Sequence, residues 1–358
     1  MPRVINRRGG RVIPGPGRGG FMGRGGLGVP LPFRVHNDQE EGDSVDAKEE
    51  ASSSPTSNSE GPRNFEPDLD DVFLVKDLLK RAGDLPDEIA LMILDSAEYW
   101  ACSSTTVEYD GLRNGSLPIR GGTPGENKLL VRSEPIGMTL WSPDDQEAWQ
   151  LQAMPEEPNN VVPREELHDY VDERIDSVLE SPCRKIVFKI TSNDQGWSGN
   201  RADHGTYRSS WTWFDAGIDR FTAPPESAKG KEAAEIGDDI SVSALRPVWP
   251  PVTQDENGSP KYDHALHATQ DHKIQCNKTA TRETQHHVVE WHYTDDINPE
   301  LSEADELEAS GRGRATGNGE FVRNLKLGDV ITIWGKARFG GWENRVKKVE
   351  LKVYWKAV

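Results

Sequence analysis

Histidine is the residue type whose number and spacing could most readily support chemistry in this chain. Histidines gather in the C-terminal third, with one cysteine nearby, at His264, His267, His272, His286, His287, His292 and Cys276. The i,i+3 spacing of His264 and His267 would place two imidazoles on one helical face, where they could bind a metal ion. However, no acidic metallohydrolase motif follows, and a strand over 286–292 would point its histidines to both faces. We therefore expect scattered loop and strand histidines, with no bound metal or cofactor.

Other catalytic patterns are missing from the sequence. It has no Gly-x-Ser-x-Gly elbow, and its N-terminal glycines neither follow a strand nor precede a helix, as those of a phosphate loop would. Cys183 heads an apolar strand, where a buried role is commoner than a nucleophilic one. A triad whose members are distant in sequence stays open. The sequence thus favours a non-enzymatic protein without excluding an enzyme.

A binding surface has better support, because two tryptophans occur in turn-like contexts. Trp197 lies in a loop of Gly, Ser, Asn and Asp, and Trp342 follows the pair Gly340-Gly341. A flat apolar ring beside planar hydrogen-bonding groups suits a carbohydrate or peptide site. The alternative is that both rings close the ends of a core. The expected ligand-binding residues are Asn193, Asp194, Gln195, Trp197, Trp342, Asn344 and Arg345.

These residues belong to a C-terminal block, 183–358, that is predicted to form β-strands separated by turns. Runs of apolar alternation or β-prone composition predict strands over 183–191, 206–214, 240–245, 284–293, 321–325, 329–337 and 349–355. No amphipathic helices lie between them, so we expect a mainly β fold, an antiparallel jelly-roll-like β-sandwich. Long polar insertions would lie at the ends of that sandwich.

Helices are predicted ahead of the β block. Helical spacing of apolar residues begins at Val72, and Gly83 can end that helix. Pro86 and the acids after it suit the first turn of a second helix. Its apolar stripe consists of Ile89, Ile93, Ala97 and Trp100, and Leu91 and Leu94 widen it. We expect a small helical hairpin over 71–101 that buries this stripe.

A connecting segment, 102–182, follows the hairpin. It is predicted to end in an amphipathic helix over 162–179, which begins near Pro163 and ends before Pro182. Two short apolar runs, 129–131 and 138–141, could be strands that join the β block.

The first 70 residues are expected to be a disordered tail. Residues 1–35 are rich in Gly and Arg and contain three Arg-Gly-Gly units, which give a weak indication of RNA contact. Residues 38–67 are acidic and rich in Ser and Pro, as in a solvated linker. The net charge of -18 is concentrated upstream of the nearly neutral β block.

Composition also bounds the compartment. Three cysteines far apart do not form a disulfide framework, which favours a reducing environment. No run is apolar enough for a membrane span or a secretory signal. The expected localisation is cytoplasmic or nuclear.

The stretch that begins at Leu85 resembles the opening of an F-box. The match to the family pattern Leu-Pro-x-Glu-Ile…Ile-Leu is carried by Leu85, Pro86, Glu88, Ile89, Ile93 and Leu94. In that family, these residues begin a three-helix domain that docks on the adaptor subunit of a cullin-type ubiquitin ligase. The resemblance implies that Leu85, Pro86, Ile89, Ile93 and Leu94 would contact the partner. The sequence departs from the pattern after Ala101, and the alternative is a hairpin that only packs on the β domain.

The β block contains the motifs Lys185-Ile-Val-Phe188, Asp194-Gln-Gly-Trp197, Gly205 to Phe214 and Trp334 to Trp342. Their combination with the helix above resembles a group of largely uncharacterised fungal proteins that pair such a helix with a Trp-rich β module. This resemblance covers 85–101 and 183–355 and implies an architecture but no established activity. The expected function is that of an intracellular interaction protein with a β-sandwich recognition module, in one version a ubiquitin-ligase substrate adaptor. The alternative is a lectin-like protein that binds a glycan.

Overall fold

A computed structural model describes residues 3–7, 65–143, 146–151, 170–175, 181–221 and 245–357. All the elements below belong to one compact unit made of residues 1–9 and 66–358. Most of the tail expected over 1–70, with its Arg-Gly-Gly units, lies outside the described residues. No helix in the described part is long and apolar enough to cross a membrane.

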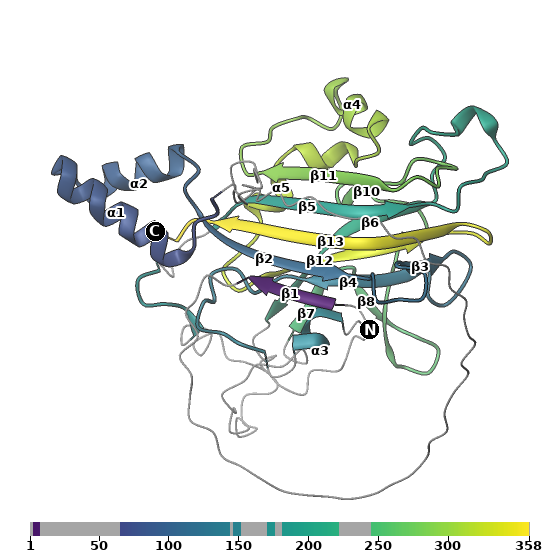
Figure 1. The fold of residues 1–358 in the computed structure, drawn as a ribbon, viewed down its shortest axis with the longest axis horizontal. Coiled ribbons are helices and arrows are strands. Elements are labelled where there is room, and N and C mark those ends of the chain that lie inside the picture. The colour runs from purple at the N-terminus through teal and green to yellow at the C-terminus, as the bar shows by residue number, and fades with distance from the viewer. Residues whose placement is uncertain are drawn as a thin grey trace, which may run out of the picture. The chain divides into compact units, whose positions relative to one another are not determined.

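The described chain is mainly β-strand, arranged in antiparallel sheets (Figure 1). The larger sheet has the order β1-β2-β13-β5-β11, and β3 also pairs with β13. Its strands are β1 (Arg3–Arg7), β2 (Ala101–Glu108), β3 (Leu117–Arg120), β5 (Cys183–Asn193), β11 (Gln285–His292) and β13 (Glu343–Trp355). We call it the six-stranded sheet, counting the strands among the described residues.

The second sheet has the order β10-β6-β12-β4, and β7 also pairs with β6. Its strands are β4 (Asn127–Arg132), β6 (Thr212–Phe221), β7 (Leu245–Trp249), β10 (Lys273–Cys276) and β12 (Val330–Ala337). We call it the five-stranded sheet, on the same count. A separate two-stranded ribbon consists of β8 (Val252–Gln254) and β9 (Pro260–Tyr262).

One hydrophobic core receives side chains from both sheets. The six-stranded sheet contributes alternate residues such as Phe188 and Leu351, and the five-stranded sheet contributes residues such as Phe214 and Ile333. The period-two pattern of β5 and β13 produces this burial, because successive side chains point to opposite faces. The sequence-predicted strands over 183–191, 284–293, 329–337 and 349–355 are confirmed.

Two sequence-predicted strands are wrong in whole or in part. Residues 206–211 form turns after the short 3-10 helix η2 (Arg201–Asp203), and the strand starts only at Thr212. Gly205 and Ser209 have positive φ angles of 74° and 53°, which an extended strand cannot accommodate. The run 321–325 is not a strand, because α5 (Glu320–Arg323) begins there after Gly319, whose φ is 71°.

The β structure also begins earlier than the expected boundary at Cys183. β2 pairs with β13 from Ala101 onward, and β4 pairs with β12. The predicted run 129–131 therefore does join a sheet, whereas 138–141 forms a turn and no strand. The helix α3 (Gln146–Leu151) packs near β4. Of the helix expected over 162–179, the described part, 170–175, is turn-like rather than α-helical.

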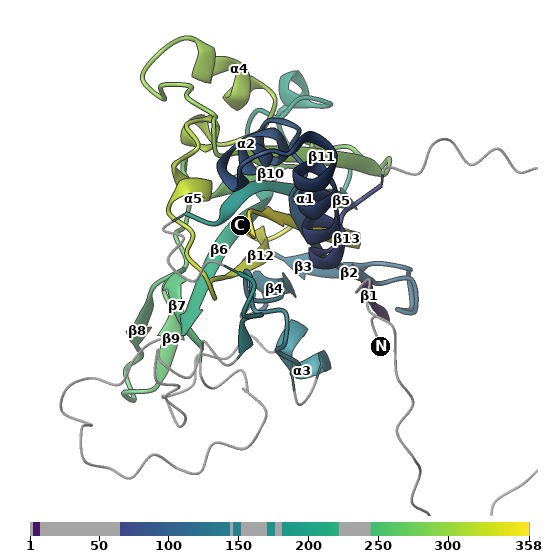
Figure 2. The same ribbon diagram turned by 90° about the vertical axis from the view of Figure 1, so that its left-hand side faces the viewer.

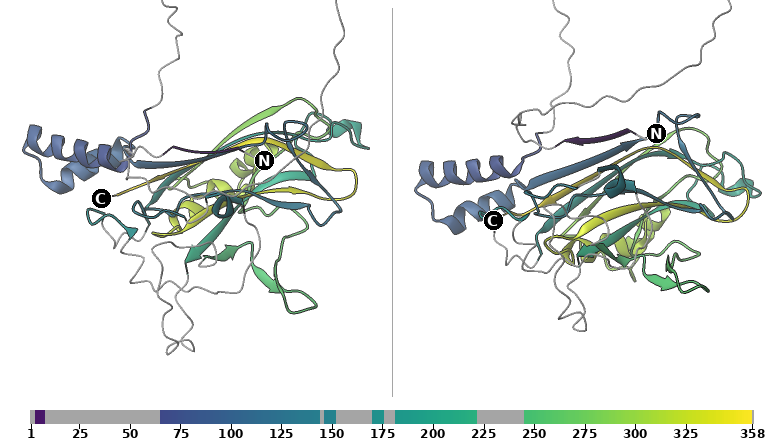
Figure 3. Two further views of the ribbon diagram at one scale, coloured as in Figure 1. Left: turned by 60° about the horizontal axis from the view of Figure 1, so that its bottom comes forward. Right: turned by 90° about the horizontal axis from the view of Figure 1, so that it is seen from below.

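The two predicted N-terminal helices are present as α1 (Leu69–Gly83) and α2 (Asp87–Ser96), which lie beyond the ends of β2 and β13 (Figures 2 and 3). Asp68 and Asp71 form a reciprocal capping box at the start of α1. The buried positions of α2 are Ala90 and Leu94, one residue on from the predicted pair Ile89 and Ile93. The predicted stripe is therefore right in part: Trp100 and Leu94 are buried, whereas Ile89, Ile93 and Ala97 are exposed, because α2 is broadly apolar and its sequence does not single out one face.

The hairpin is held to the β domain by polar contacts at its base. Asp95 Oδ1 accepts hydrogen bonds from Trp100 Nε1 at 2.8 Å and from Arg184 Nε at 3.2 Å. Glu98 pairs with Lys185 of β5 at 2.7 Å. Because both basic residues lie at the start of β5, the hairpin is anchored at one end of the six-stranded sheet.

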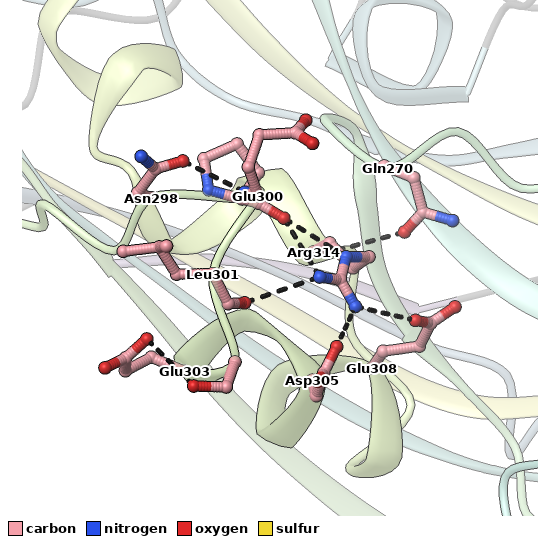
Figure 4. Close-up of polar contacts among 10 residues, drawn as sticks. Gln270, Asn298, Glu300, Leu301, Glu303, Asp305, Glu308 and Arg314 are labelled. Carbon is pink, nitrogen blue, oxygen red and sulfur yellow. Dashed lines mark hydrogen bonds and ion pairs between the residues drawn. The ribbon is translucent and has the colours of Figure 1, made fainter.

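The insertion between β11 and β12 is organised around one guanidinium (Figure 4). Arg314, in η5 (Arg314–Gly317), donates to the carbonyls of Pro299 and Leu301 and pairs with Asp305 and Glu308 of α4 (Glu303–Ala309). Its backbone N–H also donates to Gln270 Oε1 at 3.0 Å. The insertion is therefore an internally bonded structure of the described chain.

Candidate functional site

The loops that follow β5 and precede β13 meet at one end of the β domain, which we call the loop end. It comprises residues 109–126, 194–211, 277–284 and 338–345. Gly121 lies against the backbone of Arg338 and Phe339, and Gly341 lies beneath Trp197. These approaches bring together loops that are more than 140 residues apart in the sequence.

Buried polar side chains hold the backbone of the loop end. The Asp194 carboxylate is fully buried and accepts hydrogen bonds from the N–H groups of Gly196, Ala280 and Thr281 at 2.6–2.8 Å. Burial raises the pKa of this carboxyl group. Asp194 therefore ties the loop after β5 to the loop before β11.

Two further expected ligand residues also serve as internal ties. Gln195 accepts from the Glu343 N–H at 3.1 Å and donates to the Trp197 carbonyl at 2.7 Å. Asn344 is fully buried, accepts from Asn277 at 3.0 Å and donates to the carbonyls of Trp213 and Lys336. Asn193 is buried as well and donates to the Asp194 carbonyl. These side chains shape the loops and leave little polar surface for a ligand.

The aromatic rings of the loop end are the groups that face solvent. Trp197 is 56% exposed, and a Cβ placed on Gly341 would lie 3.0 Å from the indole. Phe339 is 45% exposed and has a positive φ of 62°, a conformation that costs energy for a residue with a side chain. Trp342 is half-buried. The alternative that both tryptophans close a core therefore does not describe Trp197.

The loop end also carries several guanidinium groups. Glu343 bridges Arg120 at 2.7 Å and the expected ligand residue Arg345 at 2.6 Å, which lowers the pKa of the glutamate against the opposing effect of burial. The side chain of Arg282 crosses Gly196, where an added Cβ would collide with its Cγ. Arg282 forms no hydrogen bond or ion pair with any residue that the structure describes. The loop end thus places an unpaired cation against Gly196, the residue directly before the exposed Trp197.

The hairpin presents a different surface, made of aliphatic side chains. Its large exposed apolar residues are Leu74, Leu78, Ile89, Met92 and Ile93, which we call the hairpin surface. The expected docking residues divide accordingly: Ile89 (41% exposed) and Ile93 (40%) face solvent, Leu85 is half-buried, Pro86 is exposed, and Leu94 is buried. No three-helix unit forms over 85–120, because β2 and β3 occupy 101–120.

A third group of polar residues lies on the five-stranded sheet and is buried. Lys336 pairs with Asp215 at 2.8 Å, and Arg132 pairs with Asp219 at 2.9 Å. The Lys336 ammonium lies 4.9 Å from the centre of the Trp249 ring, and burial lowers its pKa. All four charged side chains are at most 3% exposed, so these pairs have the surroundings of a structural core.

Several of the described histidines and cysteines are packed in the protein interior. Across the described residues, no three His, Cys, Asp or Glu side chains lie close enough to hold a metal ion. His272 stacks on Trp249 with ring centroids 4.0 Å apart, and the ring centroids of His264 and Trp334 are 4.7 Å apart. Burial lowers the pKa of His264 to about 3 and raises that of Cys183 to about 12, so the imidazole is neutral and the thiol protonated at pH 7.

Some surface residues were missed by the sequence reasoning. The exposed position of Phe339 depends on its turn, which the following Gly340-Gly341 pair could have indicated. Arg282 carries no local signal, because only the Asp194 bonds bring its loop beside Trp197. Leu74, Leu78 and Met92 were predicted merely as helix positions. Comparison of the chain with protein-family models, with curated proteins and with solved structures finds no match.

Proposed function

We propose that this chain is a non-enzymatic interaction protein whose hairpin docks on a protein partner and whose β domain recognises a second molecule. The observation that carries the proposal is the exposure of Ile89, Met92 and Ile93 on a helix whose opposite side is packed. Exposed aliphatic side chains of a helix are an anchor type for a groove in another protein. The capping box and the Asp95 contacts preorganise the hairpin, which reduces the entropic cost of docking.

The partner that the F-box resemblance implies is the adaptor subunit of a cullin-type ubiquitin ligase. Two helices of the family's three would make this contact, since the chain continues as β2. The hairpin segment, 66–100, carries ten acidic and three basic residues. The partner's groove is therefore expected to be apolar with a basic border. On this proposal the protein acts in the cytoplasm or the nucleus.

The β domain is proposed to be a jelly-roll sandwich. Two Greek keys folded together give sheets in which the first strand neighbours the eighth and the second neighbours the seventh. With β2, β4, β5, β6, β10, β11, β12 and β13 numbered as the eight strands, the orders β2-β13-β5-β11 and β4-β12-β6-β10 fit that scheme. The shared core supports packing of the two sheets against each other.

Docking is tested by affinity purification and quantitative mass spectrometry of the full chain. The variant Ile89→Asp/Ile93→Asp changes exposed residues, so it should fold. A matched control is Val288→Asp on β11, because Val288 is also apolar and 67% exposed but lies outside the hairpin. The proposal expects ligase adaptor subunits with the wild type and the control and their loss from the double variant. Equal recovery from all three chains, or no ligase subunit at all, would contradict it.

The second candidate function is lectin-like glycan recognition at the loop end. The specific observation in its favour is the 56% exposed indole of Trp197 above Gly341, because such a flat face can stack on a sugar ring. Glycan-array binding that is lost in Trp197→Ala would support this function, and an array without any signal would count against it.

A further inference from the structure

The loop end combines two kinds of group that few neutral-sugar sites need together. The first is the exposed indole of Trp197. The second is a set of cations: the four loop-end segments carry eight basic and six acidic residues. Asp194 is buried and accepts hydrogen bonds from backbone N–H groups, and Glu343 and Asp203 form ion pairs with arginines. Positive charge is therefore in excess on the accessible part of this surface.

Arg282 is the cation best placed to meet a ligand. Its side chain runs across Gly196, the residue directly before Trp197, and none of the described residues pairs with its guanidinium. Gly196 has a φ of 82° and no side chain, which gives the arginine room to lie there. A guanidinium binds a planar carboxylate or a sulfate through two parallel N–H groups.

Backbone ties fix the relative positions of these groups. Hydrogen bonds from the Ala280 and Thr281 N–H groups to Asp194 connect the loop of Trp197 to the loop of Arg282. A hydrogen bond from the Glu343 N–H to Gln195 connects the loop of Trp197 to the start of β13. A buried carboxylate and a buried amide thus preorganise an exposed ring and an exposed cation. Preorganisation of this kind lowers the entropic cost of binding a ligand that spans both.

We infer that the loop end binds an acidic oligosaccharide, in which Trp197 stacks on a sugar ring and Arg282 pairs with a carboxylate or sulfate on that ring or its neighbour. This inference rests on the lectin-like function proposed above and specifies its ligand class. It is independent of docking by the hairpin surface.

Titration calorimetry of the full chain with two matched probes tests the inference. Tetragalacturonate carries the carboxylates, and its full methyl ester keeps the same rings and length without the charge. A κ-carrageenan tetrasaccharide, which carries sulfate groups and no carboxylate, is the third probe and separates a sulfate from a carboxylate as the recognised anion. We expect at least one acidic probe to bind at least ten times more tightly than the ester.

Variants assign the two contacts. Arg282→Gln should weaken the acidic probe about tenfold and leave the ester unchanged, whereas Trp197→Ala should abolish binding of both. Arg208→Gln is the control, because Arg208 is an exposed loop-end arginine that already faces Asp203, and less than a twofold change is expected. Circular dichroism and urea unfolding verify that each variant is folded.

Two outcomes would overturn the inference in distinguishable ways. If the ester binds as tightly as the acidic probes, or Arg282→Gln changes nothing, the acidic ligand class is wrong while lectin-like recognition stands. If none of the three probes binds to the folded wild type, both the acidic ligand and the lectin-like function are rejected. The docking proposal would be untouched, because its purification test uses different residues.

Discussion

Strand β5 connects two regions of opposite character. At its Cys183 end lies the hairpin, with exposed aliphatic side chains among ten acids and three bases. At its Asn193 end lies the loop end, where exposed aromatic rings accompany eight bases and six acids. The hairpin is a regular helical pair held at its base by side chains, whereas the loop end is irregular backbone held by buried polar groups. The same β framework thus presents one surface suited to a protein groove and another suited to a polar, anionic ligand.

Removing the polar tie at each end of β5 should affect stability to different degrees. Asp194→Ala deletes the acceptor of three backbone N–H groups in a buried site, and about 3 kcal/mol of unfolding free energy should be lost. Asp95→Ala at the hairpin base removes an acceptor that is 27% exposed, and about 1 kcal/mol should be lost. Urea denaturation measures both. Equal losses would show that the two ends are held in the same way.

Packing of the hairpin can be tested at two adjacent positions. Leu94 is 4% exposed, and Leu94→Ala should cost about 3 kcal/mol, because it leaves a cavity against the β domain. Ile93→Ala should cost less than about 1 kcal/mol, because that side chain already faces water. Thermal or urea unfolding of the pair checks the assignment. The reverse order would mean that Ile93, and not Leu94, packs on the β domain.

Acid should weaken the two regions at different pH values. His287 lies in β11 near the loop end, and burial lowers its pKa to about 4. In the unfolded chain this histidine is protonated near pH 6.5. The stability that neutral His287 contributes to the folded state is fully present above pH 6.5 and is lost as the pH falls toward 4. Lowering the pH from 7 to 5.5 should therefore reduce the unfolding free energy by about 1.2 kcal/mol.

Urea unfolding of the wild type and of His287→Gln at both pH values checks this effect, and the variant should lose about 1.2 kcal/mol less on acidification. At the hairpin, the hydrogen bond from Lys185 lowers the pKa of Glu98, so that contact persists until the pH falls below the usual glutamate range. An identical pH response in variant and wild type would remove His287 as the cause.

The smallest expected effect sharpens the electrostatic side of the comparison. Glu343→Gln breaks two ion pairs with partly exposed arginines and should change stability by less than about 1 kcal/mol. It also releases Arg120 and Arg345, so the affinity for an acidic oligosaccharide should rise two- to threefold. A calorimetric titration of the variant checks this, and a fall in affinity would assign Glu343 a direct role in binding.

Regular strands and helices were predictable because their residues carry the information locally. Alternation in β5 and β13 and the helical spacing in α1 each concern neighbours in the sequence. Turn chemistry was harder, as at Ser209, where a positive φ ends a β-prone run. The buried face of α2 was predicted only in part, because Ile89, Leu94 and their neighbours are all apolar, and only tertiary packing selects among them.

The candidate site was predictable only in outline. Trp197 and Trp342 were found from their turn contexts, but the roles of Asp194, Gln195 and Asn344 as internal ties depend on loops far away in the sequence. The pairing of Arg282 with the neighbourhood of Trp197 is a product of those ties. No local pattern encodes it, because it depends on how loops from different strands meet.

The two ends of β5 are proposed to serve two separate partners. Two separate variants, Ile89→Asp/Ile93→Asp and Trp197→Ala, are each shown to be folded and then compared. Each is assayed both for recovery of ligase adaptor subunits and for calorimetric binding of the acidic oligosaccharides. The account predicts that the hairpin variant loses only the protein partner and that the loop-end variant loses only the oligosaccharide. Loss of both partners in either variant, or of neither partner in both, would contradict it.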